Sequence, residues 1–473
     1  MAQPRPRDVS AVPADDVIVQ RLWRTDLPRE HGFTPLEVRG QLPAELRGTL
    51  WRNGPGLFGL FGRPYTHPFE GDGAITAVRL GDAATGAVRV TDTPGLRAER
   101  RAGRMLYGLG VPWLRRVRNA LGARVKNTAN TSVLVWQDRV LALMEAGRPV
   151  ELDARELRTI GETDLGGVVG GAFSAHPHRV PARRATYNFG VAYGRHHRLR
   201  LYELPDVGAA RVVAEVPLRY PAMLHDFVVT DRHAVWLIHP LALDLPRLLT
   251  GRGGFADVFR WQPDHASEVV AIPLDRPDEV VRFDVPHCWQ WHFASARRRA
   301  DHEVVVDYVR YPDASSLRGL SRGPTGDGFA PGTLHRAVID LTARRLRTEP
   351  VAARACEFPR VHPDREAGAW RTVWVSLDDD RAVGAIDADT GAIDAWPLPA
   401  GHRGGEPVVV PRRGRDGERD VWILVQCYDG VADRSGVLIF DGARFPDDPV
   451  AEAWFDHRIP VTFHGVWQAE ASA

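Results

Sequence analysis

Short runs of apolar residues, separated by polar turn residues, dominate the hydrophobic pattern of this chain. Residues 133–145 (VLVWQDRVLALME) contain two such runs around a tight turn, and residues 226–238 (DFVVTDRHAVWLI) repeat the arrangement. Residues 303–311 and 421–430 are further runs rich in Val, Ile and Tyr. Runs of this length and composition are typical of β-strands, and helical periodicity is scarce. The pattern therefore predicts an all-β protein.

A longer repeat is superimposed on these runs. A β-rich run, an acidic turn and a second β-rich run recur at intervals of roughly 50 to 70 residues. The turns lie near Asp82, Asp153, Glu203, Asp275, Asp340, Asp387 and Asp441. Seven hairpins at this spacing predict seven four-stranded blades, and hence a seven-bladed β-propeller. We also expect a helical and loop cap over its top face. Because Asp-rich turns occur in any β protein, a pair of β-sandwiches is the main alternative.

Two segments depart from the strand pattern. Residues 1–33 begin with a polar, Pro-rich stretch and are interpreted as an N-terminal arm, which leaves 34–473 as a single propeller domain. Residues 104–126 alternate apolar side chains with arginines. Such a segment either dips into a membrane surface, with its arginines on headgroups, or packs its apolar face on the domain.

Composition excludes several classes of protein. The 61 basic and 60 acidic residues give a net charge of +1, so no global field draws the chain to nucleic acid. The three cysteines lie far apart and suggest no disulfide framework. The N-terminus has no apolar signal region, and no run of about 18 apolar residues occurs. We therefore expect a cytoplasmic protein, with peripheral membrane association through 104–126 as the open question.

Four of the 18 histidines stand in settings that suit a buried metal site. His176, His225, His292 and His464 each lie at the edge of an expected strand, among apolar, aromatic or small residues. The inner strands of a propeller converge on one axis, so ligands far apart in sequence can meet there. Imidazole suits Fe, Zn, Cu and Ni, and the pattern alone leaves the metal open.

Three glutamates stand in similar apolar settings, at Glu145, Glu357 and Glu406. A carboxylate there is costly unless it is paired. Paired with ligand histidines, these side chains would accept hydrogen bonds from the ring N–H groups and offset the charge of an ion. Taken singly, each is more often a turn or rim residue.

The GPGLFG motif at residues 54–59 matches a dinucleotide-binding loop only weakly, because no βαβ unit surrounds it.

Nine motifs, taken together, resemble the carotenoid cleavage oxygenases, non-haem iron enzymes built on a seven-bladed propeller. The resemblance runs from about residue 34 to residue 468, and the motifs appear in family order. They are LRGTLWRNGPGLF (46–58), HPFEGDGAI (67–75), KNTANTSVLVW (126–136), LALMEAGRPVELD (141–153), AHPHR (175–179), MLHDFVVT (223–230), EFPRVHP (357–363), GEPVVVPR (405–412) and FHGVW (463–467).

The resemblance implies one Fe(2+) per chain, bound by His176, His225, His292 and His464. The glutamates that orient the ligands in the family fall on Glu145, Glu357 and Glu406. Residues 295–298 depart from the family pattern, which makes His287 the alternative to His292.

The implied reaction is cleavage of a carbon–carbon double bond of a carotenoid or apocarotenoid by O2, giving two carbonyl products. The lignostilbene-cleaving branch commonly carries Lys, which binds a phenol, at the position of Met144. The apolar residue here favours a polyene. A stilbene or propenyl-phenol oxygenase remains the alternative, and a non-catalytic carotenoid-binding protein is a second one. Our candidates for the wall of a substrate tunnel are Phe69, Met144, Trp289, Trp291, Phe293 and Trp467.

Overall fold

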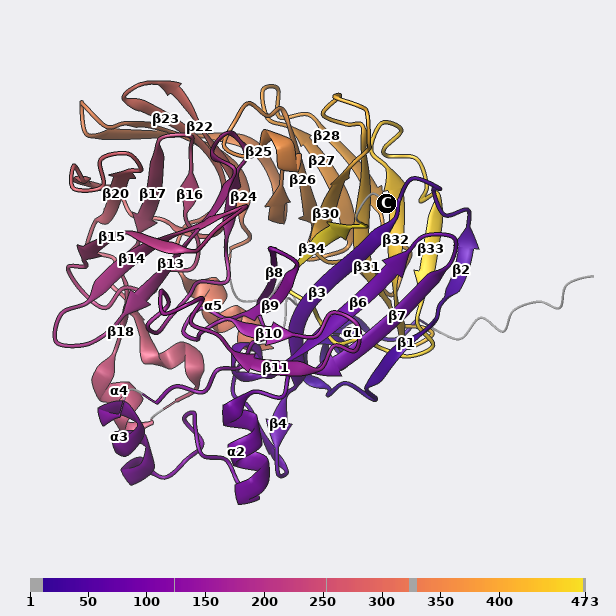
Figure 1. Cartoon of the computed structure of the whole chain (residues 1–473), viewed down its shortest axis with the longest axis horizontal. Helices are drawn as coiled ribbons and strands as arrows, with labels where there is room; N and C mark the ends of the chain where they lie inside the picture. Colours follow the sequence, from indigo (N-terminus) through magenta and orange to yellow (C-terminus); the bar gives the residue numbers. More distant parts are fainter. Residues whose placement is uncertain (1–11, 123, 252, 323–329, 471–473) are drawn as a thin grey trace, which may run out of the picture.

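Seven β-sheets arranged around a central axis form the body of the protein (Figure 1). The computed structural model describes residues 12–122, 124–251, 253–322 and 330–470. The fold class predicted from the sequence, a seven-bladed β-propeller with helices and loops on one side, is confirmed. Mostly apolar strands form the blades because both faces of each sheet are covered by neighbouring blades.

The blades follow one another along the chain. Blade 1 contains β1 (His31–Pro35), β3 (Gly48–Leu57), β6 (Asp72–Leu80), β7 (Ala84–Val90) and β34 (His464–Ala469). Blade 2 contains β8 (Ser132–Trp136), β9 (Arg139–Leu143), β10 (Val150–Leu152) and β11 (Thr159–Glu162). Blade 3 contains β12 (His178–Val180), β13 (Ala185–Ala192), β14 (Arg198–Pro205) and β15 (Arg211–Pro217). Blade 4 contains β16 (Val228–Val229), β17 (His233–Ile238), β20 (Ser267–Pro273) and β21 (Val281–Val285).

The long strand β25 (Arg345–Arg360) serves two blades, since residues up to 355 pair with β24 and residues from 356 pair with β26. Blade 5 contains β22 (Trp289–Ala300), β23 (Glu303–Tyr311), β24 (Thr333–Asp340) and the first part of β25. Blade 6 contains the end of β25, β26 (Thr372–Leu377), β27 (Ala382–Asp387) and β28 (Ile393–Pro397). Blade 7 contains β2 (Glu37–Gly40), β29 (His402–Arg403), β30 (Pro407–Pro411), β31 (Val421–Asp429), β32 (Arg434–Asp441) and β33 (Ala451–Trp454).

Both ends of the chain close the ring of blades. The C-terminal strand β34 pairs with β3 in blade 1, with Asn53 opposite His464. The N-terminal strand β2 pairs with β33 in blade 7. Through these two pairings, segments from the two ends of the chain complete the first and last blades. They also place the first residue of β34, His464, at the axis.

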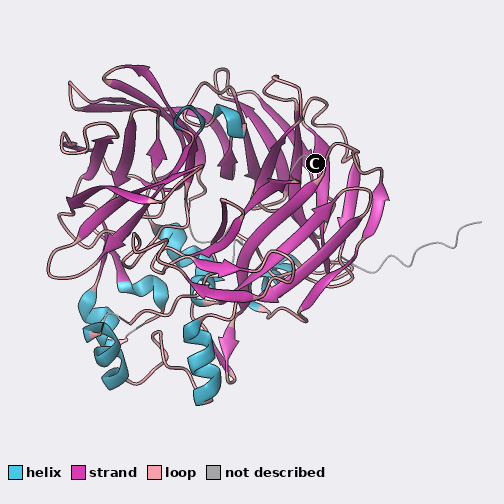
Figure 2. Ribbon diagram, viewed as in Figure 1, coloured by secondary structure: helices cyan, strands magenta, loops and turns pink. Residues whose placement is uncertain are grey.

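Short helices and hairpins lie outside the blades. The helices are α1 (Asp15–Arg24), α2 (Pro94–Ala102), α3 (Trp113–Leu121), α4 (Leu245–Thr250) and α5 (Ser315–Gly319), with single 3-10 turns η1 (Pro68–Glu70), η2 (Pro181–Arg183), η3 (Phe255–Val258), η4 (Leu320–Arg322) and η5 (Pro363–Arg365). The hairpins are β4 (Gly59–Leu60) with β5 (Arg63–Pro64), and β18 (Leu241–Leu243) with β19 (Phe259–Trp261). Figure 2 shows α2, α3 and α4 together at one edge of the molecule.

The two atypical segments have different surroundings. Residues 1–11 of the N-terminal arm lie outside the described residues, and the arm continues as α1, which buries Ile18, Leu22 and Trp23 against the core. In the segment 104–126, Val111 is buried, whereas α3 has no buried side chain. Among the described residues, no helix is both long and apolar enough to span a bilayer.

Candidate metal centre

Every blade supplies one of the seven candidate residues. His464 begins β34 in blade 1, His176 and His225 directly precede the inner strands β12 and β16, and His292 lies in the inner strand β22. The glutamates come from the other three blades, since Glu145 follows β9, Glu357 lies at the end of β25 and Glu406 precedes β30. The convergence of four histidines and three carboxylates from seven blades on one axis follows from the propeller, not from any local motif.

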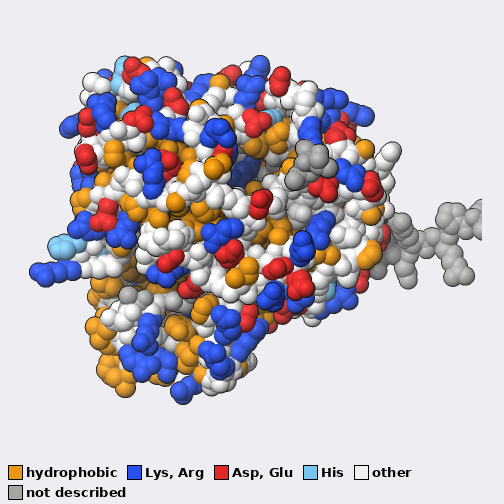
Figure 3. Space-filling model, viewed as in Figure 1, with side chains coloured by type: hydrophobic (Ala, Val, Ile, Leu, Met, Phe, Trp, Pro, Cys, Tyr) orange, Lys and Arg blue, Asp and Glu red, His pale blue; other side chains and the backbone are white. Residues whose placement is uncertain are grey.

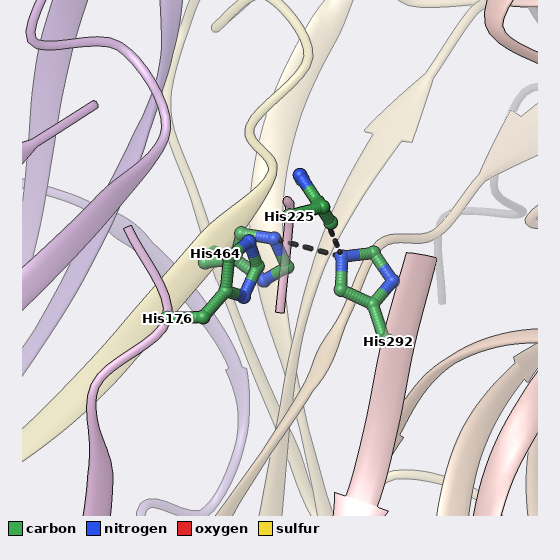
Figure 4. Close-up of side chains that lie close together, drawn as sticks. All are labelled: His176, His225, His292 and His464. Carbon is green, nitrogen blue, oxygen red and sulfur yellow. Dashed lines mark hydrogen bonds between the residues drawn. The ribbon is translucent and has the colours of Figure 1, made fainter. Parts of the chain in front are cut away.

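The four histidine rings converge on one point (Figure 4). One ring nitrogen of each lies within 4.8 Å of the others, and all four residues are buried. Nε2 of His292 lies 3.3 Å from Nε2 of His225 and 3.2 Å from Nε2 of His464. The ring centroids of His176 and His225 are 4.2 Å apart. Four buried imidazoles this close together are costly unless something binds their lone pairs.

The donor set fits a metal ion. Imidazole nitrogens bind such ions at about 2.1 Å, so neighbouring nitrogens lie about 3.0 Å apart at a right angle and about 3.4 Å apart at the tetrahedral angle. Both measured separations fall between these limits. Nε2 of His176 is buried and has no hydrogen-bond partner among the described residues. An unpartnered buried nitrogen facing three other imidazoles is the arrangement expected of a ligand.

Carboxylates hold the other nitrogen of three rings. Nδ1 of His292 lies 2.5 Å from Glu357, and Nδ1 of His464 lies 2.8 Å from Glu406. A carboxylate oxygen of Glu145 contacts Nδ1 of His225. A carboxylate at Nδ1 fixes the proton there and leaves the Nε2 lone pair free for a metal. The structure thus brings all seven predicted residues together.

Glu406 is the most deeply embedded of the three acids. It is 1 % exposed and accepts hydrogen bonds from Arg52, Arg360 and the backbone N–H of Gly465. Burial alone would raise the pKa of Glu406, but Arg360, His464 and Arg52 outweigh it and hold the pKa well below its usual range. The acid is therefore ionised and fixed in orientation.

Charge and burial keep two of the ligand rings neutral. Burial, together with His225 and His464, lowers the pKa of His176 well below its usual value. Burial also lowers the pKa of His464 to about 4, despite Glu406. Neutral imidazole is the form that binds a metal, so these two rings are ready to bind at neutral pH.

Four residues at the site were not singled out from the sequence. Arg52 is buried within β3 and Arg360 is the last residue of β25, and both donate to the buried Glu406. Asp226 accepts from the backbone N–H groups of Phe227 and Phe293 and thereby links the segments that carry His225 and His292. Phe358 packs its ring 5.2 Å from His292 and has a φ of 54°. Left-handed backbone at a bulky residue carried no sequence signal.

The structure distinguishes between the two candidate ligands near residue 290. His292 belongs to the cluster, whereas the ring of His287 lies 5.7 Å from that of Trp261, outside the four-histidine group. β22 is irregular from Gln290 to Ser295, where its pairing register with β23 shifts.

The aromatic candidates divide into two groups. Trp291 packs edge-on to His225 at 4.8 Å, and Phe69 packs on Trp291 and Phe463. Trp289 lies behind Trp291, at 5.0 Å. These rings surround one side of the histidine cluster.

The other tunnel candidates have different neighbours. Met144 forms an isolated β-bridge with Phe173, directly beside Glu145. Phe293 packs on Tyr308 in a hydrophobic cluster between blades, and Trp467 packs against the cluster between blades 1 and 7. Only Phe69, Trp289 and Trp291 therefore lie in the aromatic group next to His225.

Comparison with known proteins identifies the family. The model of the family described as "Retinal pigment epithelial membrane protein" matches residues 25–469. An apocarotenoid-15,15'-oxygenase from Synechocystis sp. is 31% identical over 93% of this chain and 94% of its own length. An isoeugenol monooxygenase from Pseudomonas putida is 26% identical over 92% of this chain and 94% of its own. The crystal structure of a cobalt-substituted Synechocystis ACO superposes with a TM-score of 0.89 at 30% identity, covering 96% of this chain and 99% of that one. This chain therefore belongs to the retinal pigment epithelial membrane protein family.

Proposed function

We propose that this protein is a non-haem iron(II) dioxygenase that cleaves a carbon–carbon double bond of a carotenoid or apocarotenoid. The observation that carries the proposal is the set of four convergent histidines, three of them held by carboxylates at Nδ1. Its relatives include an apocarotenoid-15,15'-oxygenase. His176, His225, His292 and His464 would hold the ion, which supplies the redox chemistry with O2 when bound.

The overall reaction needs no further reactant. Cleavage of one C=C bond by one O2 molecule gives two C=O groups, so both oxygen atoms enter the products and no electron donor is consumed. No net proton is transferred, which agrees with a site whose acids are occupied in holding imidazoles. The contribution of the chain is to bind, orient and exclude water.

The aromatic rings beside the cluster suit an apolar polyene. The Trp291 ring packs on His225, and the Phe69 ring packs on Trp291. Such surfaces gain free energy from the apolar area that they bury with a substrate. Held between them, a polyene would keep one double bond beside the metal ion.

A phenolic substrate is the second candidate, because an isoeugenol monooxygenase is among the relatives. Its phenol would need a polar or charged partner. Met144, which immediately precedes Glu145, offers a thioether instead. This residue favours the polyene over the stilbene or propenyl-phenol. A third candidate, a carotenoid carrier without activity, would have no use for three carboxylates on the ligand rings.

The surface of α3 and α4 suits contact with a lipid bilayer, from which such a substrate would enter. Trp113, Leu114 and Leu121 of α3 are 60%, 65% and 85% exposed, and Leu245 of α4 is 50% exposed. Figure 3 shows hydrophobic side chains next to arginines in this region. Exposed apolar groups flanked by arginines are typical of a peripheral membrane contact.

Product analysis tests the proposal. Protein purified anaerobically with iron is incubated in air with an apocarotenal, β-carotene, a hydroxystilbene and isoeugenol, and products are identified by mass spectrometry. We expect two carbonyl fragments from a polyene. Turnover of the phenolics alone would overturn the substrate assignment, and bound pigment without iron or cleavage would support the carrier.

A further inference from the structure

Lys126 is the only lysine among the 61 basic residues of this chain, and it is buried. Its side chain is 8% exposed, while those of its partners Asp72 and Glu99 are 1% exposed. Nζ lies 2.7 Å from a carboxylate oxygen of each acid and 2.9 Å from the hydroxyl of Tyr65. Three acceptors around one point suit a compact ammonium group and not the planar fork of arginine. The site therefore explains why lysine occurs here.

One side of this network holds the segment 94–122, which carries α2 and α3 and is called here the cap segment. Glu99 lies on α2 and uses its second oxygen to accept from the backbone N–H groups of Leu106 and Tyr107, at 2.7 and 3.2 Å. Arg116 of α3 donates to the carbonyl groups of Leu249 and Thr250, which ties the cap segment to α4. Through Glu99, Lys126 thus holds the cap segment, which carries the surface proposed to contact the membrane.

The other side of the network holds the loop 126–131, which runs past the metal centre. Asp72 begins β6, and the next residue, Gly73, donates its N–H to the carbonyl of Thr128 at 2.8 Å. Nδ2 of Asn53 donates to the carbonyl of Ala129, which has a φ of 47°. A strained backbone of this kind persists only where its surroundings fix it.

This loop touches both the proposed tunnel wall and a metal ligand. Nδ2 of Asn130 donates to the carbonyl groups of Phe69 and Gly71, at 3.0 and 2.8 Å. The backbone N–H of His464 donates to the carbonyl of Thr131 at 3.2 Å. A shift of the loop would therefore move Phe69 and His464 together.

We propose that Lys126 is a positioning residue that holds the cap segment and the loop 126–131 in a fixed position relative to each other. It thereby aligns the substrate entry with the metal centre. The effect of Lys126 on catalysis rests on the proposed function. The joint ordering of the two segments does not depend on that function. No group of the network belongs to the four-histidine cluster.

The test compares Lys126→Met with Arg336→Met in full-length protein. Arg336 is the matched control, because it pairs at 2.8 Å with Asp307, a carboxylate that is 0% exposed, in blade 5. Lys126→Met leaves two buried acids without their cation and Arg336→Met leaves one, so both variants lose stability. Hydrogen exchange measured by mass spectrometry reports local opening, and the visible spectrum of the cobalt(II)-loaded protein reports the ligand geometry.

For Lys126→Met we expect about tenfold faster exchange in both 94–122 and 126–131, an altered cobalt spectrum and about tenfold lower kcat/KM. Arg336→Met should leave the exchange of these two segments, the spectrum and kcat/KM as in the parent protein. If Lys126→Met loosens neither segment, or only one, the proposal is wrong. If the parent protein shows no cleavage activity, the proposed function is refuted. The hydrogen exchange rates and the cobalt spectrum would still decide whether Lys126 orders the two segments.

Glu99→Gln provides a second variant should Lys126→Met fail to fold. It removes one charge and keeps the pairing of Lys126 with Asp72. We expect faster exchange in the cap segment and parental exchange in 126–131, with the parental cobalt spectrum. Unchanged hydrogen exchange in the cap segment would show that Glu99 does not connect this segment to Lys126.

Discussion

Replacing Glu357 with Gln isolates the charge of one carboxylate at the metal centre. Glu357 accepts from Nδ1 of His292, from the N–H of Phe358 at 2.7 Å and from the hydroxyl of Tyr311 at 2.7 Å. His292 and Phe358 bind the same oxygen, Oε2. The amide oxygen of Gln can take that place. The amide NH2 then faces Tyr311, whose hydroxyl can turn to accept, so the geometry is kept and only the charge is lost.

The size of the effect follows from the role of the acid. Carboxylates behind ligand histidines contribute 10- to 100-fold in metal affinity, which corresponds to about 1.4–2.7 kcal/mol. No arginine pairs with Glu357 among the described residues, so Glu357→Gln strands no buried cation. Burial raises the pKa of Glu357, but His292 and the hydrogen bonds lower it below its usual value, so the parent side chain is ionised at neutral pH.

The assay is anaerobic iron(II) titration against a chelator of known affinity. Glu151→Gln serves as control, because Glu151 pairs with Arg139 on a partly exposed face of blade 2, away from the cluster. We expect 10- to 100-fold weaker iron binding for Glu357→Gln and the parental affinity for Glu151→Gln. Equal affinities for the parent and Glu357→Gln would refute the reasoning that links the carboxylate to the ligand ring.

Three further predictions concern the ligand set, the membrane contact and pH. His292→Ala should lose the bound iron while His287→Ala keeps it, as measured by metal analysis; the reverse result would exchange the two assignments. Trp113→Ser combined with Leu114→Ser should reduce sedimentation with anionic vesicles several-fold without lowering the melting temperature, and undiminished sedimentation would exclude α3 from the contact. Ionised Glu406 should stabilise the folded protein. This stabilisation should be fully present above about pH 4.3, the pKa of Glu in the unfolded chain, and should be lost as the pH falls through the lower pKa of Glu406 in the folded protein. Urea denaturation of the metal-free protein at several pH values should therefore show a difference between parent and Glu406→Gln that shrinks only below that value, and a difference that shrinks between pH 8 and 6 would contradict the assignment.

Part of this structure could be predicted because it depends on alternation and spacing. Apolar runs such as 133–145 and the recurring acidic turns indicate blades, since each run must bury both faces of a strand. The resemblance of nine ordered motifs pointed to His176, His225 and His464, which the fold brings together. His292 was harder to choose, because the residues after it depart from the family pattern.

The remainder depends on contacts between blades that no local pattern encodes. The pairing of Arg52 with Glu406 joins residues 354 positions apart. The helix α1 was missed within a segment that begins as a polar arm, although Ile18, Leu22 and Trp23 are spaced for one buried helical face. Proximity in sequence also says little about the direction of a side chain, since Phe293 follows a ligand histidine and its ring packs on Tyr308. Adjacent residues of a strand point to opposite faces.

The most direct test of the central claim is mass spectrometry of the products that the iron-loaded protein forms from an apocarotenal in air, with His225→Ala as control. The account predicts two carbonyl products whose combined formula equals the substrate plus one O2, and none from the variant. An intact substrate after incubation with fully iron-loaded parent protein, or equal cleavage by His225→Ala, would contradict it.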